Sequence, residues 1–126
     1  MSIASRAMEA GGNQPLRSRI VTDDEMGRAL DWLRDNASEI GAARARLIKS
    51  ERMLAHIEAL CTKASDASSD QKRKADARTD PRWLAAVQEE AEAAGAFETM
   101  KALREAAIAR LEAWRSEQAT IRGIRI

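Results

Sequence analysis

The chain has 126 residues, of which 44% are apolar and 33% are charged, and its formal net charge is +1. Three tryptophans, one phenylalanine, no tyrosine and two prolines argue against a β-sandwich or barrel, whose strands need β-branched and aromatic residues and frequent turns. We therefore predict an all-α protein. Because alanine supplies much of the apolar content, one copy of the chain is expected to bury only a thin core.

Helix breakers dominate the start of the chain. Gly11, Gly12 and Asn13 lie just before Pro15, and arginines are scattered on both sides of this cluster. We predict a flexible basic N-terminal arm over residues 1–21. The remaining residues, 22–126, are predicted to form one helical domain.

The first long helix is expected to begin at Thr22 and to end at about Ala64. Thr22 and Glu25 have the spacing of a capping box, in which each side chain bonds the free backbone N–H of the other residue. Apolar residues then recur every seven positions, which keeps one seam of a helix turned toward a neighbouring helix. These residues are Met26, Leu33, Ile40, Leu47, Leu54 and Cys61.

A polar segment over residues 65–80 predicts a turn region that can include some helix. Asp80 and Pro81 then predict the start of a second long helix, because proline at the first helical position loses no hydrogen bond. This helix is expected to reach about Arg122, with Gly95 as its weakest point. Its apolar seam consists of Met100, Leu103, Ala107, Leu111, Trp114, Gln118 and Ile121.

Charged residues are arranged in blocks of alternating sign. Residues 22–39 hold six acids against two arginines, residues 44–52 hold four cations against one acid, and residues 85–98 hold four glutamates and no cation. The C-terminal segment is basic again. This order favours two long antiparallel helices, a helical hairpin. The same order would serve two different subunits, so the register and the source of the partner helix stay open.

The two seams predict that copies of the chain assemble into an oligomeric helical bundle or ring. The predicted oligomer interface consists of Met26, Leu33, Ile40, Leu47, Leu54, Leu103, Leu111 and Trp114. The size of the oligomer does not follow from the pattern.

No residue pattern indicates catalysis, a metal site or a cofactor. His56 and Cys61 are the only histidine and the only cysteine, and their spacing does not align them on one helical face. Cys61 is expected to pack in the core as a reduced thiol. The sequence has no apolar run of membrane-spanning length and no signal-peptide stretch, so we expect a cytoplasmic protein with no membrane partner.

Basic residues around the turn are the candidate DNA-binding site. They are Lys72, Arg73, Lys74, Arg78 and Arg82. Repeated around an oligomer, these cations would bind a polyanion without sequence preference, through counterion release. The alternative is that they only keep a helical surface soluble. Trp32 and Trp114 could offer a stacking surface to a base, but packing in the core or between subunits is favoured, because Trp114 belongs to an apolar seam and Trp32 flanks one.

Three short stretches provide a family resemblance: ALDWL at 29–33, KADARTD at 74–80 and LEAWRS at 111–116. Their order and separation over residues 26–125 resemble the UvsY family of phage recombination mediators. The resemblance implies a small helical protein that forms a ring-like oligomer and binds single-stranded DNA. It also implies a role in loading a strand-exchange recombinase where a single-strand binding protein is already seated, in a bacterial host cell. The basic residues credited with DNA contact in the family do not align one for one between residues 60 and 72.

The leading hypothesis is therefore a non-enzymatic recombination mediator, in which the helical hairpin of residues 22–126 is the oligomerisation and DNA-binding domain. The alternative is a structural or adaptor coiled-coil protein, such as a virion component or a chaperone, that oligomerises without binding DNA. The identity of the recombinase and the part played by the N-terminal arm lie beyond the sequence.

Overall fold

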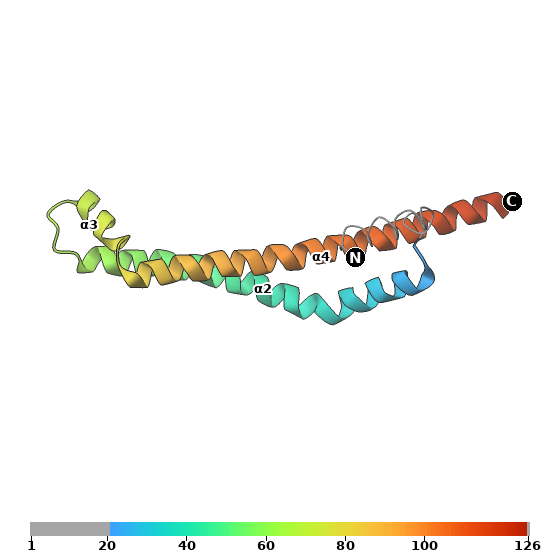
Figure 1. Cartoon of the computed structure of the whole chain (residues 1–126), viewed down its shortest axis with the longest axis horizontal. Helices are drawn as coiled ribbons and strands as arrows, with labels where there is room; N and C mark the ends of the chain where they lie inside the picture. Colours follow the sequence, from blue (N-terminus) through green and yellow to red (C-terminus); the bar gives the residue numbers. More distant parts are fainter. Residues whose placement is uncertain (1–20, 126) are drawn as a thin grey trace, which may run out of the picture. The chain divides into compact units, whose positions relative to one another are not determined.

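The computed structural model describes residues 21–125, and within them the chain is all-helical, with no strand (Figure 1). Its helices are α2 (Asp23–Ala64), α3 (Asp70–Ala77) and α4 (Pro81–Arg125). The predicted fold class, all-α, is confirmed. The predicted N-terminal arm lies outside the described residues, apart from Val21.

α2 begins where the capping box predicted. The Thr22 hydroxyl accepts a hydrogen bond from the Glu25 backbone N–H at 3.1 Å, and the Thr22 carbonyl accepts one from Met26 at 3.0 Å. Asp23 follows Thr22 in a first turn that is wholly acidic, which suits the positive end of the helix dipole. The helix then continues without a break to Ala64, close to the predicted end.

The connection between the long helices contains α3. The sequence predicted only a turn region here, with some helix in it. Ser69 is the N-cap of α3, and the Ser69 hydroxyl accepts a hydrogen bond from the Lys72 backbone N–H at 3.2 Å. Ser65 donates to the Asp76 carboxylate at 2.7 Å, which ties the start of the connection to α3. α4 then begins at Pro81, as predicted, and Asp80 caps it by accepting from the Arg82 backbone N–H at 2.8 Å.

The described residues form two compact units. The turn unit comprises residues 36–103 and the terminal unit comprises residues 21–35 with 104–125. In the turn unit, Arg46 of α2 bonds Glu89 of α4 at 2.8 and 3.1 Å, and Glu58 pairs with Arg78 at 3.6 Å. In the terminal unit, the Trp114 indole donates to Asp23 at 2.8 Å.

Only small side chains are buried in either unit. The buried residues are Ala29, Ser50, Cys61, Ala77, Ala93 and Ala107, and no large side chain among the described residues is fully buried. On α2 of the turn unit, the covered positions alternate in steps of four and three residues, as in a coiled-coil seam: Ala43, Leu47, Ser50, Leu54, Ile57 and Cys61. Small residues let two helices approach closely but bury little apolar area, so the core is thin.

Candidate nucleic-acid interface

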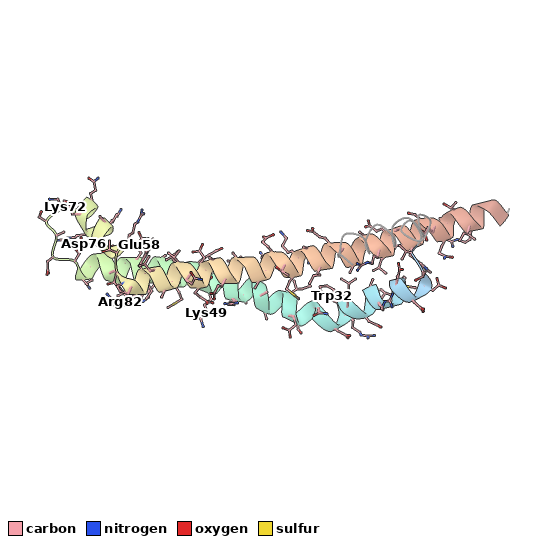
Figure 2. The ribbon with its side chains drawn as sticks, in the orientation of Figure 1. Trp32, Lys49, Glu58, Lys72, Asp76 and Arg82 are labelled. Atoms are coloured by element: carbon pink, nitrogen blue, oxygen red, sulfur yellow. The ribbon has the colours of Figure 1, made fainter. Side chains whose placement is uncertain are left out.

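The structure brings the five predicted DNA-binding cations into one segment of the turn unit. Lys72, Arg73 and Lys74 lie on α3, Arg78 is the C-cap of α3, and Arg82 lies in the first turn of α4. All five side chains are exposed, and Figure 2 shows Lys72 projecting from α3 into open space. α3 thus serves as a short platform for three consecutive cations.

Three of these five cations are engaged within the chain. Arg73 donates to the Ala67 carbonyl at 2.8 Å, and Arg78 pairs with Glu58 at 3.6 Å. Arg82 bonds both carboxylate oxygens of Asp80, at 3.2 and 3.0 Å. The ion pairs of Arg78 and Arg82 offset part of the positive charge that would attract a phosphate. The hydrogen bond of Arg73 occupies one of its donors.

Lys72 and Lys74 differ from the arginines, because neither forms an ion pair with any residue from 21 to 125. Their ammonium groups are the positive charges of the cluster that remain available to an external anion. A groove of about 560 Å³ between α3 and the end of α2 has Lys74 on its border, together with Lys63 and Arg73. Glu58 and Asp70 line the same groove, so its charge is mixed.

Asp80, Arg82 and Cys61 form a small cluster where α4 begins. The hydrogen bond from the Arg82 guanidinium holds the pKa of Asp80 at about 2, below its ordinary 3.8. Burial raises the pKa of the Cys61 thiol, and the adjacent Asp80 carboxylate acts in the same direction. Cys61 is only 4% exposed, so the prediction that it packs in the core is confirmed. The cluster fastens the start of α4 to α2 and keeps the thiol protonated.

We predict that replacing Asp80 lowers the melting temperature in a pH-dependent way. Because the pKa of Asp80 is lowered in the folded chain, its stabilising effect is complete above about pH 4, near the unfolded pKa, and is lost as the pH falls toward 2. Asp80→Ala, which removes the cap and the charge, should lower the melting temperature by several degrees at pH 7. Asp80→Asn keeps a capping oxygen and should lower it less.

Circular dichroism melts at pH 7 and about pH 2.5, at one protein concentration, measure both effects. The difference between wild type and Asp80→Asn should shrink at the lower pH. An equal difference at both values would contradict the role of the Asp80 charge.

Seven of the eight residues predicted for the oligomer interface are half-buried within the chain. They are Met26, Leu33, Ile40, Leu47, Leu54, Leu111 and Trp114. Leu103 is 47% exposed. The α2 residues of this set lie on or beside the seam that faces α4 in each unit, so most of them already contact the same chain in part.

A second apolar face of α2, which the sequence analysis did not single out, is more exposed. Ile48 is 39% and Met53 is 45% exposed, and they line a shallow hollow of about 540 Å³ made by α2 alone. Lys49, Arg52 and His56 border this hollow. We call these residues, with Ala45, the outer face of α2. The helical repeat places this face on the side of α2 opposite the seam that carries Leu47 and Leu54.

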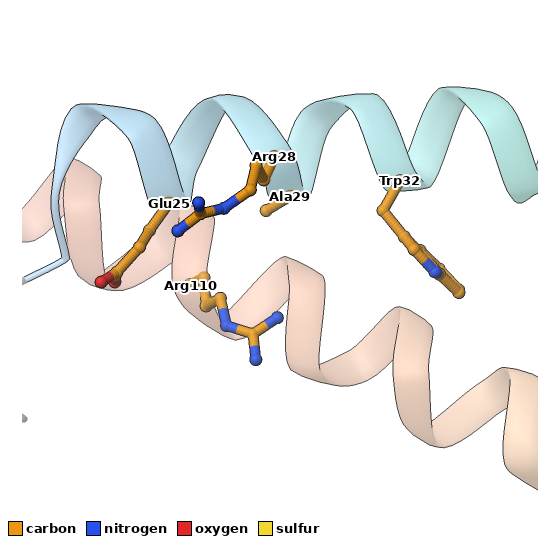
Figure 3. Close-up of a pocket in the computed structure, with 5 residues that line it drawn as sticks. All are labelled: Glu25, Arg28, Ala29, Trp32 and Arg110. Atoms are coloured by element: carbon orange, nitrogen blue, oxygen red, sulfur yellow. The ribbon is translucent and has the colours of Figure 1, made fainter.

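The terminal unit contains a pocket that the sequence analysis also missed. Glu25, Arg28, Ala29 and Trp32 of α2 line it together with Arg110 of α4, around a volume of about 530 Å³ (Figure 3). The four α2 residues share one helical face by their spacing, which was a visible signal. Arg110 stands far away in the sequence, and no local pattern could connect it with them.

Within residues 21–125, no group of three or more histidine, cysteine, aspartate or glutamate side chains is placed to hold a metal ion. None of the described helices combines the length and the apolar content that crossing a bilayer requires. Comparison with protein-family models, with curated proteins and with solved structures found no match to this chain.

Proposed function

We propose that this protein is a non-enzymatic, oligomeric helical protein that binds single-stranded DNA without sequence preference and acts as a recombination mediator. The observation that carries the DNA-binding part is the pair Lys72 and Lys74, which is exposed on α3 and has no carboxylate partner among the described residues. One pair attracts phosphate weakly. Repeated in each copy of an oligomer, it presents a series of cations to a polyanion.

We infer that α2 and α4 form an antiparallel hairpin. In the turn unit, Arg46 of α2 pairs with Glu89 of α4, and Cys61 near the end of α2 lies against Asp80 at the start of α4. Residue numbers therefore fall along α4 as they rise along α2. The acidic block at 85–98 therefore supplies the partner of Arg46. Arg46 also lowers the pKa of Glu89, as expected for a carboxylate beside a guanidinium.

Self-association is supported by the thin core and by the outer face of α2. The chain fully buries no large side chain among its described residues, yet it exposes Ile48 and Met53 side by side with Lys49 and Arg52. A second copy is the occupant that fits this face, because Glu90, in the acidic block of residues 85–98, forms no ion pair with residues 21–125 and offers Lys49 or Arg52 a charge of opposite sign. Contact between α2 of one copy and α4 of the next is heterologous, and such contacts form a ring when the rotation from copy to copy closes.

The mediator role comes from the resemblance of three stretches to the UvsY family, together with the properties above. A recombinase and a single-strand binding protein are its proposed partners, in the cytoplasm of a bacterial host. The acidic residues of the first block, 22–39, leave a surface of suitable charge for a basic protein partner.

A salt titration of binding to fluorescent oligothymidine tests the DNA-binding proposal. The logarithm of the binding constant should fall linearly with the logarithm of salt concentration, with a slope of about −0.7 for each phosphate neutralised. Oligocytidine should bind with similar affinity. A slope near zero, or no binding in low salt, would contradict the proposal.

The competing candidate, a structural or adaptor protein, is favoured by one observation. Residues 63–82 hold six bases and four acids, and two of the arginines, Arg78 and Arg82, form ion pairs within the chain. A segment of nearly balanced charge can serve only to stabilise the turn. An oligomer that does not bind DNA at low salt would support the structural or adaptor role.

A further inference from the structure

The pocket of the terminal unit combines two cations with an aromatic surface. Figure 3 shows the Trp32 indole projecting from α2 toward the facing turns of α4, the Arg28 side chain extending toward the Glu25 side of the pocket, and Arg110 on α4. Ala29 is 3% exposed at the base of the pocket, where its small side chain leaves the space open. The volume of about 530 Å³ falls within the range of small-ligand sites in proteins.

The charges of the pocket favour an anion. Arg28 and Arg110 are exposed and form no ion pair with residues 21–125, whereas Glu25 is the single acid that lines the pocket. Guanidinium groups bind phosphate oxygens in a planar, two-point geometry. The pocket therefore has an excess of positive charge, in the chemical form that suits phosphate.

Trp32 adds the second half of a nucleotide site. Its side chain is half-buried, so part of the indole borders the pocket and part packs against the protein. A partly packed indole is held in position and can stack with any base, since every base has a π-face. Arginines alone would suit many anions, but arginines beside an indole match the alternating phosphate and base of a nucleic acid strand.

We propose that this pocket binds one nucleotide of single-stranded DNA, with the base stacked on Trp32 and a neighbouring phosphate paired with Arg28 and Arg110. This inference rests on the proposed function, but it assigns DNA contact to a site separate from the α3 lysines. An acidic peptide would use the two arginines but has no flat base to stack on the part of the indole that borders the pocket, so a nucleotide matches more of the lining.

The first test compares oligothymidine with an abasic oligonucleotide of the same length. Wild type should bind oligothymidine at least about five-fold more tightly, the smallest effect typical of one stacked base. Trp32→Leu, which keeps an apolar helix-forming side chain, should bind both strands equally, and Trp32→Phe should restore part of the difference. Trp83→Phe, in the turn unit, is the control and should behave as wild type.

The second test follows tryptophan fluorescence and salt dependence. Oligothymidine should quench wild type and Trp83→Phe, and the quenching should be largely lost in Trp32→Leu. Arg28→Gln combined with Arg110→Gln should make the log-log salt slope shallower by about 0.7 for each phosphate contact removed per engaged subunit. Circular dichroism establishes that each variant is folded.

The outcomes separate the two proposals. If wild type binds DNA with a steep salt slope but treats the abasic strand and oligothymidine alike, the pocket is not a nucleotide site and the proposed function stands. If polyglutamate of equal charge displaces oligothymidine as effectively as a second oligonucleotide does, the pocket is an acidic-peptide site. If neither strand binds in low salt, the proposed function fails, and this inference fails with it.

Discussion

Replacing Lys72 and Lys74 together with glutamate is expected to abolish binding of oligothymidine at about 0.15 M salt and to leave the mass of the oligomer unchanged. The substitution turns two unpaired positive charges on α3 into negative ones in every copy. The salt slope should become shallower by about 1.4 for each subunit that engages the strand, because two phosphate contacts are lost. Fluorescence anisotropy measures the affinity, and light scattering measures the mass.

The control for this variant is Arg104→Glu with Arg115→Glu. It changes the net charge equally, at two exposed positions of α4 outside the α3 cluster and outside the outer face of α2. A smaller loss of affinity in the control is expected, since general repulsion alone remains. Equal losses in both variants would show that total charge, rather than the α3 lysines, governs binding.

A second pair of substitutions, Ile48→Glu with Met53→Glu, is expected to weaken self-association by at least about 100-fold. Both side chains are exposed in the single chain, so the change should cost little in the fold of one copy. In the proposed assembly each would be buried against a neighbour, where lost apolar burial and a buried charge both oppose contact. Sedimentation velocity over a concentration series measures the change.

Ala37→Glu with Ser38→Glu serves as the matched control, because it adds the same charge at two exposed positions of α2 away from the outer face. The control should keep the wild-type assembly. If both variants assemble as wild type does, the outer face of α2 is not an interface. The half-buried seam residues would then be the remaining candidates.

The starts of the long helices could be predicted because their causes are local. Thr22 and Asp80 each bond a backbone N–H within the next three residues, so the signal is contained in a few neighbouring letters of the sequence. α3 was less predictable. Its N-cap, Ser69, stands among other polar residues that could equally form a turn, and the helix has only eight residues.

The seam of α2 was predicted in part. The seven-residue repeat identified Leu47, Leu54 and Cys61, but not Ser50 or Ala43, because a polar or small residue gives no apolar signal. The Ser50 hydroxyl donates to the Leu47 carbonyl at 2.7 Å, and this hydrogen bond within the helix lets the polar side chain be buried on the seam at little cost.

The candidate site was less accessible to sequence reasoning, because its properties depend on contacts between distant residues. The cluster of five cations is visible in the sequence, but the pairing of Arg78 with Glu58 is not. That contact separates the engaged arginines from Lys72 and Lys74. The pocket that Arg110 lines together with Trp32 likewise needs α2 and α4 to be placed side by side within the terminal unit.

Sedimentation velocity of the full chain mixed with fluorescent oligothymidine tests the central claim most directly, because one run reports the mass of the protein and the species that carries the DNA. At micromolar concentration and low salt, the account predicts a complex whose protein mass is a multiple of 13.9 kDa and which carries the fluorescent strand. A protein of 13.9 kDa, with the oligonucleotide sedimenting alone, would contradict it.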